Sequence, residues 1–320
     1  MDQWLELRIK SAKIWNEGWG RCLEQRWQCT NAPVRAHSIQ NARIIDQIAE
    51  KGHVVTLSFA YHPTSTPFPD FRAVGRNMAT TFEGLCAEHD GEIFRRIDAD
   101  ALNTSDQEQL FLLAYRAVTR ELHTTMAVAY YVQRSYEKAV ELGLSPGDRP
   151  CERGKFAVER MVIAHGIFRY RSYFDEDLLG GRYERVHHRV INVPCTQPTV
   201  AVSSLFSVDS SASGNDCLFL SLSVFPLMNN RTVAIFSWRD FDDVAALAWL
   251  NERFPDGANS WTLRTQLSRI TLANCENIIF SPSLLNSLSA DEKDTIRRYI
   301  FATIFKPDSE TGLLEIDLFA

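Results

Sequence analysis

The sequence predicts an α+β protein, and three observations support this class. A helical pattern with no Gly or Pro runs from Asp106 to about Leu142. From Arg189 onward, β-branched and aromatic runs are bounded by Pro, Ser, Gly and Asn, which is typical of an antiparallel sheet. The segment from Cys22 to Asp90 holds three of the seven cysteines, together with histidines, which favours a metal site. We therefore expect a zinc-binding unit in residues 1–100 and an α+β domain in residues 101–320, helical over 105–175 and with a mixed sheet over 187–320.

The first hundred residues predict two helices and one strand. Trp4, Leu5, Ile9 and Ile14 recur at helical spacing, so a short amphipathic helix is expected in residues 2–18. The other expectations are a helix over Asn41–Lys51 with Gly52 as its C-cap, a strand over Val54–Phe59, and an irregular loop marked by Pro63, Pro67 and Pro69 that runs to about Arg72.

The remaining chain predicts long helices followed by strands. Ser105-x-x-Glu108 is a capping box that would open the longest helix, and Gly143, Pro146 and Gly147 would close it. The later expectations are, in order, a helix over Phe156–Tyr173, strands over Arg189–Val193, Thr199–Val208, Cys217–Val224 and Thr232–Trp238 with an Asn229-Asn230 hairpin turn, a helix over Asp242–Arg253, a strand over Asn277–Phe280, and a helix opened by the capping box Ser289-x-x-Glu292.

Composition points to an ordinary globular protein. Hydrophobic residues make up 45% and charged residues 23% of 320 residues, and no apolar run approaches the roughly twenty needed to cross a bilayer. The N-terminal segment is acidic and amphipathic rather than signal-like, so we expect a cytoplasmic protein. An odd number of scattered cysteines argues against a disulfide framework. The expectation is that four of them are buried or free thiols: Cys151, Cys195, Cys217 and Cys275.

The charge balance does not favour a nucleic-acid partner. The net charge is −6, whereas DNA-binding proteins usually present a basic face. Residues 1–100 contain 12 Lys and Arg against 13 Asp and Glu, which leaves room for a local basic patch. DNA or RNA therefore remains a candidate partner, and so does another protein.

Two pairs of residues have the chemistry of zinc ligands. Cys86-x2-His89 has a spacing that lets one turn present both side chains to one ion, and Gly84 would supply a positive φ for that turn. Cys22 and Cys29 form the second pair, although their spacing exceeds the usual two to four residues. His37 is a fifth candidate, so five residues compete for four positions.

These residues resemble the zinc-bearing HNH (ββα-metal) endonucleases, which are built on a treble-clef zinc knuckle. In that family a cysteine pair precedes a strand with the catalytic His, and a second ligand pair opens a helix. Here His37 follows Arg35 and Ala36 in the place of the catalytic His. The segment Leu85-Cys86-Ala87-Glu88-His89-Asp90 resembles the second pair, and Asn77 lies where the family's middle Asn often falls.

The resemblance implies a hydrolytic mechanism. A neutral His37 would activate water for attack on a phosphodiester, and Asp90 would help to hold Mg²⁺ or another divalent cation. Asn77 would orient the His37 loop or its ring, and Arg35 and Arg76 would contact phosphate oxygens. The chain departs from the family after His37, where the proline of the usual His-Ile-x-Pro is missing and forty-eight residues precede Cys86.

Two other functions fit the sequence. In one, the zinc knuckle stabilises a non-catalytic interaction or regulatory protein. In the other, the chain is a HEPN-like ribonuclease, because Arg116 with His123 and Arg160 with His165 match the loose Arg-x4–6-His spacing of that family. The adjacent pair His187–His188 is expected on the surface or in a loop before the first strand of the C-terminal sheet, because neighbouring side chains on a strand point in opposite directions and cannot readily share a metal.

Overall fold

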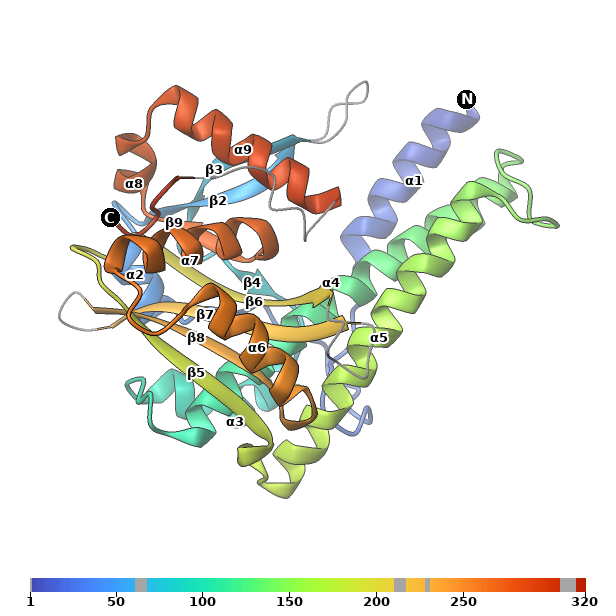
Figure 1. Cartoon of the computed structure of the whole chain (residues 1–320). Coiled ribbons are helices and arrows are strands. Elements are labelled where there is room, and N and C mark those ends of the chain that lie inside the picture. The colour runs from blue at the N-terminus through green and yellow to red at the C-terminus, as the bar shows by residue number, and fades with distance from the viewer. Residues whose placement is uncertain (1, 61–67, 210–216, 228–230, 306–314) are drawn as a thin grey trace. The chain divides into compact units, whose positions relative to one another are not determined.

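The computed structural model describes residues 2–60, 68–209, 217–227, 231–305 and 315–320. It confirms an α+β protein with long helices and an antiparallel sheet with flanking helices (Figure 1). The chain divides into two compact units, each assembled from separated segments. Unit 1 comprises Met1–Ala36, Phe82–Ile93 and Val118–Arg182, and unit 2 comprises His37–Thr81, Phe94–Ala117 and Tyr183–Ala320. The domain boundary expected at residue 100 stays a prediction. Each of the two units contains segments from both sides of that residue.

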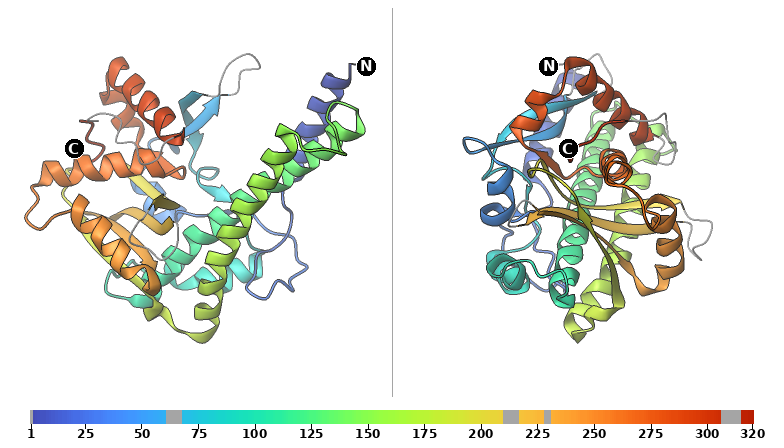
Figure 2. Two further views of the ribbon diagram at one scale, coloured as in Figure 1. Left: turned by 45° about the vertical axis from the view of Figure 1, so that its right-hand side comes forward. Right: turned by 60° about the vertical axis from the view of Figure 1, so that its left-hand side comes forward.

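Unit 1 is mainly helical, and the loop between its first helix and Ala36 carries the first cysteine pair. The helix α1 (Gln3–Glu17) begins at Asp2, whose side chain accepts a hydrogen bond from the Trp4 backbone N–H. It is followed by the C-terminal part of α4 (Gln107–Glu141) and by α5 (Glu152–Gly180). Figure 2 shows α5 returning alongside α4. The predicted helices in these regions are confirmed, and α5 is longer than expected at both ends.

Unit 2 is built on a seven-stranded antiparallel sheet. The strand order is β3-β2-β9-β6-β7-β8-β5. The strands are β2 (His53–Ala60), β3 (Phe68–Gly75), β5 (Val186–Val193), β6 (Val200–Asp209), β7 (Cys217–Leu227), β8 (Arg231–Arg239) and β9 (Ile278–Phe280). The strands β7 and β8 pair antiparallel, as predicted, while the Asn229-Asn230 turn lies outside the described residues.

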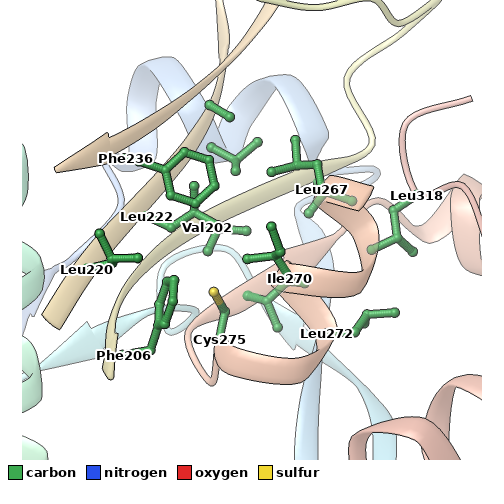
Figure 3. Packing of buried hydrophobic residues seen from close by; sticks show 14 of the residues in the cluster. Val202, Phe206, Leu220, Leu222, Phe236, Leu267, Ile270, Leu272, Cys275 and Leu318 are labelled. Atoms are coloured by element: carbon green, nitrogen blue, oxygen red, sulfur yellow. The ribbon is translucent and has the colours of Figure 1, made fainter. Parts of the chain in front are cut away.

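The main hydrophobic core lies between this sheet and its helices. Apolar side chains of β6, β7 and β8 pack against the helices α6 (Asp243–Arg253) and α7 (Ser260–Asn274). Figure 3 shows Phe206, Leu222 and Phe236 of the strands facing Leu267 and Ile270 of α7. The helices α8 (Pro282–Ser287) and α9 (Ala290–Phe305) add further apolar contacts to the same cluster.

Two predicted elements in unit 2 were wrong. The proline-marked segment is not irregular through Arg72, because Phe68–Gly75 forms β3 with Pro69 opposite Phe59. Proline is tolerated there because β3 is an edge strand and its outer N–H groups need no partner strand. Pro63 and Pro67 lie outside the described residues.

The predicted helix over Asn41–Lys51 is much shorter in the structure. A π-helix, η1 (Asn41–Ile45), leads into a single turn, α2 (Asp46–Ile48). Gly52 is therefore not a helix cap. It follows Lys51 in a tight turn between Glu50 and His53, and both turn residues have positive φ, as a two-residue hairpin turn requires.

The helix starts depend on local side-chain caps. At α4 the capping residue is Asp106 rather than Ser105, because Asp106 Oδ1 accepts the backbone N–H of Gln109 at 3.1 Å. At α9 the predicted capping box is confirmed, since Ser289 Oγ accepts the N–H of Glu292 and the Glu292 carboxylate accepts the N–H of Ser289. The helices α7 and α8 were not predicted from the sequence.

The two adjacent histidines lie inside β5 rather than in a loop before it. His188 is mostly buried, and its Nδ1 lies 2.8 Å from Ser237 Oγ on β8. Burial lowers the pKa of His188 to about 3, because a charged imidazolium would be poorly solvated there.

We expect His188 to make the protein sensitive to acid. Its folded pKa lies below the ordinary value of 6.5, so its contribution to stability is complete above pH 6.5 and is lost as the pH falls from there towards 3. The loss is at most about 1.4 kcal/mol per pH unit. When the pH falls from 7.5 to 5, the free energy of unfolding measured with urea should decrease by up to about 2 kcal/mol more for the wild type than for His188→Gln. Equal losses in the two proteins would contradict this role, and His53→Gln, which removes an exposed histidine, is the control.

Candidate metal centre

The four predicted zinc ligands come from two places in unit 1. Cys22 and Cys29 lie in the loop between α1 and β1 (Ala36–His37). Cys86 directly precedes α3 (Ala87–Ala99), and His89 lies in the first turn of that helix. Two backbone hydrogen bonds hold the loop against the second pair, from Leu23 N–H to Gly84 O and from Val34 N–H to Leu85 O, both at 2.8 Å.

The ligand atoms lie close enough to hold one metal ion. The Sγ atoms of Cys22, Cys29 and Cys86 and a ring nitrogen of His89 all lie within 4.8 Å of one another. Cys29 Sγ lies 3.8 Å from Cys86 Sγ, and His89 Nδ1 lies 3.7 Å from Cys22 Sγ and 3.2 Å from Cys86 Sγ. Around a zinc ion with ordinary bond lengths, tetrahedral S–S and S–N edges are about 3.8 Å and about 3.6 Å. The observed separations therefore fit a tetrahedral site.

None of the seven cysteines forms a disulfide in the described part of the chain. Within the part of the chain that the structure describes, no other group of three or more Cys, His, Asp or Glu side chains meets the same distances. His37 is not a member of this group. Of the five candidate zinc ligands, only Cys22, Cys29, Cys86 and His89 belong to this group.

A carboxylate explains why the first pair tolerates six intervening residues. Glu24 is buried, and its side chain accepts the backbone N–H groups of Arg26 at 2.8 Å, Gln28, and Cys29 at 3.2 Å. Burial alone would raise the pKa of Glu24, but these hydrogen bonds and the nearby His89 lower it. The charged carboxylate thus folds the loop and brings Cys29 back towards Cys22.

A buried arginine of α5 contacts the same loop. Arg171 is fully buried, and its guanidinium donates to the Leu23 carbonyl oxygen at 2.5 Å and pairs with Asp175 at 3.2 Å. Because Leu23 adjoins Cys22, this contact fixes the backbone next to the first ligand. The sequence alone did not indicate a structural role for either Glu24 or Arg171. For Glu24, the position of an acidic residue inside the Cys-x6-Cys loop could have indicated one.

Gly84 has a different role from the one predicted. Its φ is not in the positive range, so the turn before Cys86 does not need glycine for its backbone conformation. A Cβ at this position would instead collide with the ring of Phe82. Glycine is required because the aromatic ring and the backbone approach closely.

The thiols of the group differ in acidity before a metal is considered. Burial raises the pKa of Cys22 to about 12. Burial also acts to raise the pKa of Cys86, but hydrogen bonds from the His89 backbone and ring lower it to about 7. A bound divalent cation would deprotonate such thiols, because thiolates are the metal-ligating form.

His37 lies in β1 and belongs to unit 2. Its Nδ1–H donates to the Ala79 carbonyl oxygen at 2.9 Å, which fixes the ring orientation and leaves Nε2 as the acceptor nitrogen. Burial lowers the pKa of His37, so the imidazole is neutral at physiological pH. The neighbouring Ser38 is anchored, since its hydroxyl donates to Thr80 O and accepts from the Asn277 amide.

The other predicted site residues are engaged locally. Asn77 accepts a hydrogen bond from the Asn41 amide at 2.9 Å, so it contacts the segment after His37 rather than the ring. Arg35 pairs with Glu83 at 3.5 Å, and Arg76 pairs with Asp46. These ion pairs are largely exposed and are therefore weak enough for a phosphate to displace.

Asp90 lies in the first turn of α3, where its N–H donates to the Cys86 carbonyl oxygen at 2.9 Å. An acidic residue at a helix N-terminus is stabilised by the helix dipole. Asp90 belongs to unit 1 and His37 to unit 2, so their joint participation in catalysis stays a prediction.

The arginines of the HEPN-like pairs have structural contacts. Arg116 is buried, and its guanidinium binds both carboxylate oxygens of Asp98, at 2.8 and 2.6 Å. Arg160 lies over the ring of Phe156, and His165 is exposed on α5. A role for either pair in RNA cleavage stays a prediction.

A second histidine site was missed in the sequence. His187 Nδ1 lies 2.6 Å from Asp243 Oδ1, which also accepts Trp238 Nε1–H at 2.9 Å. The hydrogen bond from His187 and then that from Trp238 lower the pKa of Asp243. No local sequence pattern indicates this pair, because fifty-five residues separate His187 from Asp243. Only the pairing of β5 with β8 brings them together.

No protein-family model, curated protein or solved structure matches this chain. No helix in the described parts of the chain is sufficiently long and apolar to cross a membrane. We therefore infer function from the geometry of the site.

We expect Cys29→Ser to remove the metal. Purified wild type should carry about one ion per chain, and the variant well under half of that, because one of four ligands is lost. Elemental analysis together with native mass spectrometry measures the content. Cys151→Ser is the matched control, because Cys151 caps α5 by accepting the Gly154 N–H and serine can do the same. Equal metal content in the Cys29 variant and the control would contradict the assignment.

Glu24→Gln should weaken metal retention without removing a ligand. An amide keeps one acceptor oxygen where the carboxylate offers two, so the loop loses some of the hydrogen bonds that fold it. We expect a loss of about tenfold or more in metal affinity, as for other supporting residues around metal sites. Competition with a fluorescent chelator measures the affinity. Glu88→Gln makes the same charge change on the exposed residue beside His89, and an equal effect there would show that charge alone is responsible.

Proposed function

We propose that the metal centre is a structural zinc site and that the chain is a metal-dependent nuclease of the HNH type. Three thiolates and one imidazole are the ligands that structural zinc prefers, and a site with four protein ligands leaves no position for substrate. The zinc would stabilise the loop between α1 and β1, which contains no helix or strand of its own.

The observation that carries the nuclease proposal is the order of elements around His37. A loop with two cysteines precedes β1, β1 pairs with β4 (Thr81–Phe82), and the second ligand pair opens α3. This strand–strand–helix order is that of the treble-clef nucleases. The forty-eight residues between His37 and Cys86 contain β2 and β3, which join the larger sheet of unit 2, so they amount to an insertion between the two short strands.

His37 has the properties of a general base. Its Nδ1–H is held by Ala79 O, and its lowered pKa leaves Nε2 unprotonated at neutral pH. Water activated by Nε2 would attack a phosphodiester in DNA or RNA, while Asp90 would help to hold Mg²⁺ or another hard divalent cation that stabilises the developing charge. Arg35 and Arg76 would exchange their carboxylate partners for phosphate oxygens.

A second function is a zinc-stabilised interaction protein. The favouring observation is a series of exposed apolar side chains along α5, among them Val158, Met161 and Val162, at 59%, 47% and 65% exposure. Such patches are typical of protein contact sites. In this alternative, metal removal would destabilise unit 1, while substitution of His37 would change no activity.

We expect His37→Ala to reduce Mg²⁺-dependent cleavage of plasmid DNA or single-stranded RNA by about 10²- to 10⁴-fold, the usual contribution of a general base. Zinc content and melting temperature should stay unchanged. His53→Ala is the matched control, because the exposed His53 also donates from Nδ1 to a backbone carbonyl, that of Lys51 at 3.0 Å. If wild type cleaves neither substrate with Mg²⁺, Mn²⁺ or Ni²⁺, or if His37→Ala cleaves normally, the nuclease proposal is wrong.

A further inference from the structure

Unit 2 contains a cavity of about 600 Å³ that no step of the proposed nuclease reaction uses. Its walls come from the segment after β1, the C-terminal end of α3, the first turns of α4, and the adjoining ends of β7 and β8. Small-molecule sites in proteins commonly measure roughly 300 to 1,000 Å³. The cavity is therefore of a size that suits a small organic ligand.

Three lining side chains donate to backbone carbonyl groups at or just after the C-terminal end of α3. Gln40 donates to the Asp98 carbonyl oxygen at 2.5 Å, and Arg43 donates to the carbonyl oxygen of Ala99. Gln109 donates to Ala101 O at 3.2 Å. Because each donor already has a backbone partner, the walls are connected and the cavity is preformed, which reduces the entropy cost of binding.

One wall is the π-helix η1 (Asn41–Ile45). Its wider turn is visible in the hydrogen bond from Ile45 N–H to Gln40 O at 3.1 Å, five residues back. π-Helical turns are rare and are found frequently at functional sites. Arg43 and Ile44 of this turn belong to the cavity lining.

The cavity lining contains three arginines, Arg43, Arg116 and Arg231, and two acidic residues, Asp46 and Asp100. Both acidic residues have arginine partners: Asp46 pairs with Arg76, and Asp100 lies 3.8 Å from Arg96, which also pairs with Asp106 and Glu108. Among the described residues, by contrast, Arg43 makes no ion pair and bonds to a neutral carbonyl.

Arg231 likewise has no carboxylate partner among the described residues. Its guanidinium donates to the Asn192 amide oxygen at 3.4 Å. The buried Arg116 is neutralised by Asp98, but its Nε–H has no acceptor in the described part of the chain. The lining thus offers two guanidinium groups that have no carboxylate partner among the described residues, and one buried donor.

Apolar side chains complete the walls. Phe225 and Leu113 are buried, and Ile97 and Ile44 lie beside them in the lining. A ligand that satisfies both parts of the surface must carry an apolar body and an anionic group. A bare inorganic anion would leave the apolar walls unused, and a neutral apolar molecule would leave the guanidinium groups unpaired.

We propose that this cavity binds a small organic anion, in which a phosphate or carboxylate group contacts Arg43 and Arg231 while an apolar body packs against Phe225 and the aliphatic walls. Guanidinium groups bind both kinds of anion in a bidentate manner, so the geometry selects an anionic group rather than one acid. The site is separate from the metal centre, and its occupancy does not depend on the nuclease proposal.

The test is isothermal titration calorimetry of the full-length, metal-loaded protein with three probes: adenosine 5′-monophosphate, octanoate and inorganic phosphate. We expect binding of at least one of the first two, tighter than that of inorganic phosphate by about tenfold or more because of the apolar contacts. Preference for the nucleotide identifies a nucleoside phosphate as the ligand class, and preference for octanoate identifies a carboxylate with an aliphatic body.

The substitutions Arg43→Gln and Arg231→Gln should each weaken the bound probe by about tenfold, because each removes one charge-assisted contact. Arg298→Gln on α9 is the control, since this arginine is 77% exposed, pairs with Asp294 and does not line the cavity. A melting temperature close to that of the wild type shows that a variant is folded. If neither organic probe binds the wild type, or if both arginine variants bind like Arg298→Gln, the proposal is wrong.

Discussion

Three sulfur atoms and one ring nitrogen converge from two distant parts of the chain, and the organisation of unit 1 depends on that convergence. The loop from Gly18 to Arg35 has no helix or strand to hold it. Its fixed points are two backbone hydrogen bonds to the segment before α3, the carboxylate of Glu24, and the buried guanidinium of Arg171. Without a cation, two closely spaced thiols of very different acidity would face each other. A divalent ion would satisfy both as thiolates and would add the binding free energy that a short irregular loop lacks.

The polar contacts of Ser38 give the His37 segment a comparable local order. Ser38 is buried, with partners on β4's preceding turn and at Asn277 next to β9, so the residue beside His37 is fixed within unit 2. The segment then enters the π-helix, which forms a wall of the cavity in unit 2. One stretch of about ten residues therefore carries both the proposed general base and part of the proposed ligand site.

Much of the fold could be predicted because its signals are local. Each of these signals depends on residues only a few positions apart. They are the capping box at Ser289 and Glu292, the helical pattern of α4 without Gly or Pro, and the β-branched residues of the strands. The errors arose where tertiary context decides. Pro69 was assigned to a loop, but an edge position lets it stay in a strand. Gly52 resembled a helix cap, but the chain had already left the helix four residues earlier.

The grouping of Cys22, Cys29, Cys86 and His89 was predictable from residue type and spacing, whereas the residues that support it were not. Nothing local links Arg171 to Leu23 or His187 to Asp243, since each pair depends on elements that the fold brings together. Glu24 is different. Its three backbone partners lie within five residues of it, so the sequence contained the information but no familiar pattern drew attention to it.

X-ray absorption at the zinc K-edge of the purified protein tests the central claim most directly, because it reports both the metal and its ligand atoms. A zinc ion held by Cys22, Cys29, Cys86 and His89 gives a first shell of three sulfur atoms at about 2.3 Å and one nitrogen atom at about 2.0 Å. A shell made only of oxygen and nitrogen atoms, or a spectrum without zinc, would contradict it.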